Sequence, residues 1–200
     1  MNAQKFNQLL VTGLREKSGL EAARPYLGMS GIGGCSRKMY REFVEGRQIP
    51  SDRDHWYCWT GYMHEAAIIN LLGITQQRRE IVAAFDQRFK GHTDFEVGDT
   101  VVDIKSVGWE KFLRLQFGEE ISHNNIAQVQ MYMRHSAFFA HAVLIYVARD
   151  VPHRDFSMPF WAMDVAPDLE LMDILDDKAR RILKAIDQRQ PPVCNCGWCR

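Results

Sequence analysis

The 200-residue sequence has no excess of either charge, because 25 lysines and arginines balance 25 aspartates and glutamates. Such a chain has no global field that attracts nucleic acid or a membrane surface, so any contact with a polyanion has to come from local patches. It also lacks an apolar run near the roughly 20 residues that cross a bilayer, and its start, MNAQKFNQLL, lacks the apolar centre of a signal peptide. We therefore expect a cytoplasmic protein with no membrane contact.

Cysteine is scarce and concentrated at one end of the chain. Of the five cysteines, three lie within the last seven residues, in the stretch VCNCGWCR. This pattern does not resemble the disulfide framework of a secreted protein, and in a reducing compartment such clustering more often indicates a metal site. Candidate metal ligands are therefore Cys194, Cys196 and Cys199.

The rest of the composition suits a globular protein, with 46% hydrophobic and 11% aromatic residues, enough for one domain with a substantial core. Strand and helix patterns alternate, which predicts an α/β fold with a mixed central sheet flanked by helices. The apolar run from His141 to Arg149 is typical of a buried central strand, and Pro159 predicts an edge strand after it. A long apolar helix is expected between a cap at Thr60 and a stop at Gly73.

The stretch from Gly91 to Ser106, GHTDFEVGDTVVDIKS, has the pattern of a β-hairpin. Gly98 and Asp99 form a two-residue turn signal between two runs rich in apolar and β-branched residues. Counting back from this turn places Phe95 opposite Val102. The same register places the residues just before Phe95 and just after Val102 opposite each other.

Those two residues are both carboxylates, Asp94 and Asp103. Side chains paired across a ladder repel when they carry like charges, unless a cation such as a divalent metal lies between them. Strand alternation also places Asp103 and Lys105 on one face and Ile104 on the other, so two carboxylates and an ammonium converge. A surface hairpin with solvated charges would show the same pattern, and the hairpin alone does not separate the two interpretations.

His64 lies within the expected apolar helix and shares a helical stripe with Ile68 and Leu71, so we expect it to point inward. A lone histidine on such a face is usually a core residue, and it becomes a ligand candidate only if an anionic site lies nearby. The aromatic run from Trp56 to Trp59 precedes this helix. Exposed aromatics can stack on unpaired bases, although most such clusters pack beneath a loop.

Cys35 is expected at or just before a helix start, because a glycine-rich segment, MSGIGGC, leads into SRKMYREFVEG. A helix N-terminus stabilises a thiolate, the form that binds metal. Arg37, Lys38 and Arg41 lie in the same helix. They could meet phosphates, although a solvated basic face is the commoner explanation.

Four short motifs together resemble those of the PD-(D/E)xK nuclease superfamily, and most closely its RecB-like exonuclease branch. They follow one another in the family's order and approximate spacing: GYMHE at 61–65, GHTD at 91–94, DIK at 103–105 and QVQMY at 128–132. Each motif alone is weak, whereas all four in order form a strong signal. The branch includes CRISPR-associated and AddB-type nucleases, in which one cysteine before the core and three after it hold a [4Fe–4S] cluster.

The resemblance implies a restriction-endonuclease-like fold in a single nuclease domain over residues 1–200. Its core would span about 60–166, and elements at about 29–46 and 191–200 would bind the cluster, which would clip the N-terminal helical region to the C-terminal tail. It also implies roles for individual residues: His64, Asp94, Asp103 and the backbone carbonyl of Ile104 as ligands of Mg²⁺ or Mn²⁺, Lys105 as the catalytic lysine, Gln128 and Tyr132 as site support and DNA contacts, and Cys35, Cys194, Cys196 and Cys199 as cluster ligands.

The expected function is that of a metal-dependent DNA exonuclease acting on single-stranded ends, in recombination, repair or phage- or CRISPR-related DNA processing. The same motifs would serve a structure-specific endonuclease or nickase, and a DNA-binding subunit without turnover is a third possibility. The CxCxxC spacing is tighter than the family's triplet, so zinc remains an alternative to iron and sulfur. Cys58 could replace Cys35 as the fourth ligand, although its aromatic surroundings favour a buried structural residue.

Overall fold

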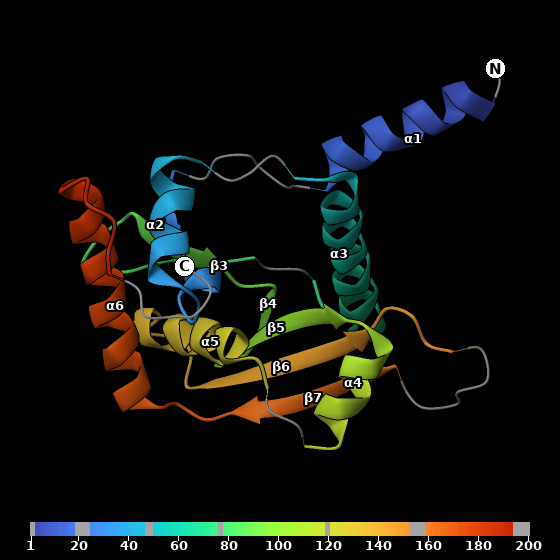
Figure 1. Cartoon of the computed structure of the whole chain (residues 1–200). Coiled ribbons are helices and arrows are strands. Elements are labelled where there is room, and N and C mark those ends of the chain that lie inside the picture. Colours follow the sequence, from blue (N-terminus) through green and yellow to red (C-terminus); the bar gives the residue numbers. More distant parts are fainter. Residues whose placement is uncertain are drawn as a thin grey trace.

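The chain folds around two β-sheets with helices on both sides, as seen in the computed structural model (Figure 1). The structure describes residues 3–18, 25–46, 50–75, 78–118, 121–152 and 159–193. The helices are α1 (Ala3–Lys17), the short 3₁₀ helix η1 (Met29–Gly31), α2 (Ser36–Val44), α3 (Asp52–Leu72), α4 (Trp109–Gln116), α5 (His123–His135) and α6 (Leu169–Asp187). The strands are β1 (Leu27–Gly28), β2 (Glu80–Val82), β3 (Phe89–His92), β4 (Phe95–Val97), β5 (Thr100–Val107), β6 (His141–Ala148) and β7 (Phe160–Val165).

The larger sheet has the strand order β4-β5-β6-β7, with β5 and β6 parallel and the outer pairs antiparallel. This confirms the predicted hairpin, because Phe95 pairs with Val102 and Gly98 takes the positive φ of 59° that the turn requires. It also confirms β6 as an inner strand and β7, which follows Pro159, as an edge strand. The sheet is mixed, as expected.

The smaller sheet, β1-β3-β2, departs from the prediction of one long hairpin strand. Residues 91–97 are divided between β3 and β4 by Thr93 and Asp94, and β3 pairs with β1 and β2 instead of with β5. The physical reason lies at Thr93, whose amide donates to the Arg79 carbonyl and whose Oγ1 accepts from the Arg79 amide. Asp94 therefore lies just beyond the ladder that ends at Phe95, and the predicted cross-strand pair of Asp94 and Asp103 does not form.

The two faces of the larger sheet carry different cores. Side chains such as Leu144 and Tyr146 belong to the main core, which includes residues of α5 and α6. Val102 and Ile104 belong to a smaller cluster with Ile68 of α3. Because side chains alternate along a strand, residues 103 and 105 point away from this smaller cluster, toward the α5 side of β5.

Helix α3 begins about two and a half turns earlier than predicted. Ser51 caps it in a reciprocal capping box with Asp54, whereas Thr60 lies inside the helix and its hydroxyl donates to the Trp56 carbonyl. The C-terminal stop at Gly73 is confirmed, with a φ of 64°. The aromatic run from Trp56 to Trp59 is consequently helical.

The remaining helices, α1 and α2, pack against other helices. Helix α2 packs against α6, and α1 projects from the body and contacts α3 (Figure 1). Within the described ranges, none of the helices combines the length and hydropathy needed to cross a bilayer.

Candidate active site

A cavity of about 300 Å³ opens where β3, α3 and α5 meet. It brings together residues from three of the four sequence motifs. Among those that line it are Glu65, Asp94, Gln128 and Tyr132, together with Arg78. Segments that are distant in the sequence therefore form one polar site beside the larger sheet.

Gln128 is the centre of the hydrogen-bond network at this site. Its Nε2 donates to Asp103 Oδ1 at 2.9 Å and to Tyr132 Oη at 2.7 Å, while its Oε1 accepts from Lys105 Nζ at 3.0 Å. Lys105 Nζ also lies 2.6 Å from Asp103 Oδ2. Tyr132 Oη in turn donates to the His92 carbonyl at 2.6 Å. One amide thus fixes the carboxylate and the ammonium of the DIK motif relative to each other.

Asp94 approaches the free edge of β5. Its Oδ2 accepts the Ile104 amide at 2.7 Å, just beyond the point where pairing with β4 ends. Desolvation, followed by the charges of Asp103 and Glu65, raises the pKa of Asp94 to about 7. The negative charges of Asp103 and Glu65 thus disfavour ionisation of Asp94, and an added cation would relieve this repulsion.

Lys105 stays cationic in this environment. Burial lowers the pKa of its ammonium, but the charges of Asp103 and Asp94 outweigh that effect and hold the pKa above its ordinary value. Tyr132 also keeps its proton, because burial and the charge of Asp103 raise the pKa of its phenol well above the usual range. Both groups are therefore hydrogen-bond donors at neutral pH.

The GHTD motif has a structural explanation for its first residue. A Cβ at Gly91 would lie 2.7 Å from Tyr132 Cε1 and 3.1 Å from Met29 Cβ, so only glycine allows the tyrosine ring to pass. This approach lets Tyr132 reach the His92 carbonyl. Gly91 and Tyr132 together hold the end of β3, which delivers Asp94 to the site.

Glu65 is a site residue that the sequence analysis missed. It is buried, lines the cavity and forms a bidentate contact with Arg78, whose Nη2 lies 2.9 Å from each carboxylate oxygen. A signal was present in the sequence, because Glu65 lies three and four residues before Ile68 and Ile69, which are both buried. An acidic residue on the apolar stripe of a helix usually has a partner or a function.

His64 lies elsewhere. Its Nδ1 is 2.8 Å from Ser106 Oγ, and Ser106 alternates with Lys105 along β5, so this contact is on the opposite face from the DIK carboxylate and lysine. Burial, followed by the charge of Arg149, lowers the pKa of His64. The residue does not line the cavity, so its role as a metal ligand stays a prediction.

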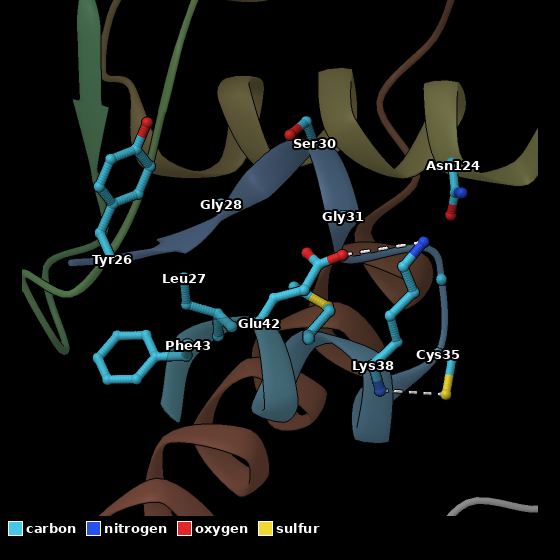
Figure 2. A pocket seen from close by; sticks show the side chains of 12 residues that line it. Tyr26, Leu27, Gly28, Ser30, Gly31, Cys35, Lys38, Glu42, Phe43 and Asn124 are labelled. Atoms are coloured by element: carbon cyan, nitrogen blue, oxygen red, sulfur yellow. Dashed lines mark hydrogen bonds and ion pairs between the residues drawn. The ribbon is translucent and has the colours of Figure 1, made fainter. Parts of the chain in front are cut away.

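A second cavity of about 260 Å³ adjoins the first and shares Tyr26, Gly28 and Ser30 with it (Figure 2). Cys35 lies on its wall at the N-cap of α2, as expected, and Sγ accepts the Lys38 amide at 3.4 Å. Lys38 also lines this cavity, with its ammonium 3.8 Å from Glu42.

The other two basic residues of α2 differ from Lys38. Arg41 is exposed, and Arg37 Nε is buried without a hydrogen-bond partner in the described part of the chain. Neither lines the two cavities. Their contact with DNA stays a prediction.

The cysteines of the predicted cluster lie partly outside the described residues. Cys194, Cys196 and Cys199 lie outside the described residues, whereas Cys35 begins α2 and Cys58 lies in α3. Lys178 of α6 donates to the Gly34 carbonyl, so the loop before Cys35 is joined to the helix that leads toward the tail. The metal-cluster clip stays a prediction.

The main cavity has the donor set that a hard divalent cation requires. Glu65 and Asp94 line the cavity, and Asp103 accepts a hydrogen bond from Gln128, which also lines it. Mg²⁺ and Mn²⁺ prefer such carboxylate ligands. Ile104 directs its amide to Asp94, and an extended residue points its carbonyl to the same side, so that carbonyl faces the same edge. Among the described residues, no three acidic, histidine or cysteine side chains already stand at ligand spacing, and Arg78 and Lys105 neutralise two of the carboxylates instead.

Comparisons with known proteins identify the fold. Comparison with protein families finds no match, and neither does comparison with curated proteins. An alkaline exonuclease, LHK-Exo, from Laribacter hongkongensis matches 82% of this chain and 89% of its own, with a TM-score of 0.61 and 14% identity. The structure of LHK-Exo in complex with dAMP gives the same coverage and TM-score, with 13% identity. A phage-related exonuclease from Haemophilus somnus 129PT matches 90% of this chain and 93% of its own, with a TM-score of 0.52 and 16% identity. The chain therefore shares the mixed α/β fold of these exonucleases, consistent with the restriction-endonuclease-like architecture predicted from the sequence.

Proposed function

We propose that this protein is a metal-dependent deoxyribonuclease that removes nucleotides from DNA ends. The observation that carries the proposal is the joint placement of Asp94, Asp103, Lys105 and Gln128 at one free strand edge. Two carboxylates and an ammonium, fixed by one amide, are suited to phosphodiester hydrolysis. The exonuclease fold supports the same conclusion.

The cation is proposed to be Mg²⁺ or Mn²⁺, held by Glu65, Asp94, Asp103 and the Ile104 carbonyl. It would supply charge neutralisation at the phosphate and a lower pKa for the attacking water. The metal ion and the Arg78 guanidinium would compete for the Glu65 carboxylate. Arg78 would therefore turn from Glu65 toward the substrate phosphate. Lys105 stays protonated. Its ammonium would donate hydrogen bonds to the attacking water or to the phosphate oxygen that gains charge. Gln128 would hold Lys105 in that position.

Cleavage of DNA tests the proposal directly. The protein is incubated with Mn²⁺ and with linear or circular single-stranded DNA of the same sequence. An exonuclease degrades only the linear form, an endonuclease or nickase cuts both, and a binding subunit leaves both intact. Asp94→Ala, Asp103→Ala and Lys105→Ala should each reduce cleavage about 100-fold or more, and near-normal turnover in any of them would reject this site.

The choice between Glu65 and His64 as ligand is tested by the Mn²⁺ concentration that gives half-maximal cleavage. If Glu65 binds the cation, Glu65→Gln raises this concentration about tenfold or more, and His64→Ala leaves it near the wild-type value. Glu96→Gln is the matched control, because Glu96 is also largely buried and paired with an arginine, Arg79, at 2.7 Å. If His64→Ala raises this Mn²⁺ concentration more than Glu65→Gln does, His64 is the metal ligand instead.

A further inference from the structure

Two arginines converge on one tyrosine in the N-terminal half of α3. The guanidinium carbon of Arg149 lies 4.5 Å from the centre of the Tyr57 ring, and that of Arg53 lies 5.3 Å from it. Arg53 Nε also donates to Tyr57 Oη at 3.0 Å. Tyr57 is 39% exposed, so solvent reaches a ring that already holds two cations.

These two cations have no carboxylate partner among the residues that the structure describes. Other arginines do, such as Arg15 with Asp52 and Arg78 with Glu65. The two carboxylates that flank Arg53 in the first turn of α3 are already engaged, since Asp52 binds Arg15 and Asp54 accepts from Ser51. The two arginines around Tyr57 therefore carry positive charge that an anion can neutralise.

A second exposed aromatic continues this surface. Trp56 is 52% exposed and its ring lies 5.5 Å from that of Trp59, at an angle of 35°. Arg53, Trp56 and Tyr57 share one side of the helix, because they are spaced by three and four residues. We call Arg53, Trp56, Tyr57 and Arg149 the aromatic platform. Flat exposed rings together with guanidinium groups are the usual means of binding single-stranded nucleic acid.

The aromatic platform lies at the end of β5 that follows Lys105. Arg149 directly follows β6, and its amide donates to the carbonyl of Val107, two residues beyond Lys105 on β5. Tyr57 and Glu65 are eight residues apart on α3, which is about 12 Å along a helix. That distance corresponds to about three nucleotides at stacked spacing. Figure 1 shows α3 beside the ends of β5 and β6.

We propose that the aromatic platform binds single-stranded DNA a few nucleotides from the cleavage site. Bases stack on Trp56 and Tyr57, and backbone phosphates contact Arg53 and Arg149. The identity of the bound strand as substrate rests on the proposed nuclease function. The platform gives that function a preference for unpaired over duplex DNA, because only unpaired bases expose their faces for stacking.

Binding is measured by fluorescence anisotropy with labelled (dT)₂₀ in EDTA, where no metal-dependent cleavage occurs. Tyr57→Ala and Trp56→Ala should each raise the Kd about tenfold, while Tyr57→Phe, which keeps the ring, should stay within about twofold of wild type. Arg149→Ala should weaken binding and reduce the salt dependence by about one phosphate contact. The control is Phe117→Ala, which removes an aromatic that is 82% exposed and lies outside the platform.

Thermal unfolding of each variant separates binding from a structural role. A stack that only fastens α3 to the sheet would lower the melting temperature of Tyr57→Ala and leave the Kd unchanged, which would overturn the proposal. If Tyr57→Ala does not fold, the exposed variants Trp56→Ala and Arg53→Ala decide by the same criterion. Cleavage by the wild-type protein is scored separately. Weaker binding by the variants supports the platform even if the wild type proves inactive, whereas unchanged binding rejects the platform and leaves a measured nuclease activity standing.

Discussion

Both the nitrogen and the oxygen of the Gln128 side-chain amide form hydrogen bonds within the site. Its two donors serve Asp103 and Tyr132, and its oxygen accepts from Lys105. A glutamate at this position could not donate to Asp103, and a shorter side chain would not reach Lys105. The residue touches the two charged groups of the DIK motif and is therefore best described as a positioning residue.

We predict that Gln128→Ala lowers cleavage about 10- to 100-fold, because Asp103 and Lys105 lose their common partner. Gln130→Ala is the control. Gln130 is another buried glutamine of α5, but it bonds the Ala166 carbonyl and the Asp168 amide, away from the site. Both variants should lose about 1–3 kcal/mol of stability, and only Gln128→Ala should lose activity beyond that. Equal activities in the two variants would contradict this role.

Asp94 makes the metal-free protein sensitive to pH. Its pKa is about 7 in the folded protein against an ordinary value of 3.8, so the folded state holds a proton that the unfolded state releases. Between about pH 4 and pH 7 the folded state therefore binds more protons than the unfolded state. Its stability falls as the pH rises through that range.

We predict that Asp94→Asn removes this part of the pH dependence. In EDTA, the melting temperature of the variant should exceed that of the wild type by more at pH 8 than at pH 5. Asp150→Asn is the control, since Asp150 also accepts a backbone amide, that of Trp109 at 2.7 Å, but lies outside the carboxylate cluster. A constant difference between Asp94→Asn and the wild type at the two pH values would refute the assignment.

At the scale of elements, two glycines of the motifs have opposite roles. A Cβ at Gly91 in β3 would collide with Tyr132 of α5, whereas a Cβ at Gly61 in α3 would meet nothing within 4 Å. Gly91 thus allows β3 to approach α5. Gly61 leaves the helix without a side chain and weakens it relative to alanine.

We predict that Gly91→Ala destabilises the protein by about 1–3 kcal/mol and reduces cleavage, because it displaces Tyr132 from the His92 carbonyl. Gly61→Ala should instead stabilise the protein by about 0.5–1 kcal/mol and leave cleavage unchanged. Urea denaturation and a cleavage assay on both variants provide the comparison. A Gly91→Ala protein with wild-type stability would show that α5 and β3 can separate without cost.

At the scale of the whole molecule, the predicted cluster would join the start of α2 to the end of the chain. The structure shows Cys35 as the N-cap of α2, with its sulfur accepting the Lys38 amide. Serine is among the best N-cap residues. Replacing Cys35 by serine therefore preserves the cap and removes only the capacity to bind metal.

This makes Cys35→Ser a direct test of the cluster. With a metal at this site, the melting temperature should fall by about 5 °C or more, because ligation energy is folding energy, whereas Cys58→Ser should cost less. If no metal binds at Cys35, Cys35→Ser should leave the melting temperature unchanged or raise it slightly. Analysis of the anaerobically purified protein for about four iron atoms, or for one zinc, distinguishes the two candidate centres.

Much of the site could be predicted because its signals are local. The turn at Gly98 and the alternation after it define the hairpin, so Asp103 and Lys105 fall on one face of β5. Helical spacing likewise places Gln128 and Tyr132 one turn apart. The break at Thr93 was not predictable in this way, because it depends on hydrogen bonds to Arg79 in another segment.

The sequence by itself determined which residue types are available for chemistry, their order, and the strands and helices that carry them. It did not determine how α3 is rotated. The stripe through His64, Ile68 and Leu71 predicts an inward histidine, and His64 does contact Ser106 of β5. Leu71, however, is 73% exposed, and the buried stripe runs through Glu65 and Ile68. Neighbouring helical residues point about 100° apart, so a rotation of that size would exchange one for the other. Only the packing of α3 against β5 fixes that rotation, and it is this packing that brings Glu65 rather than His64 to the cavity.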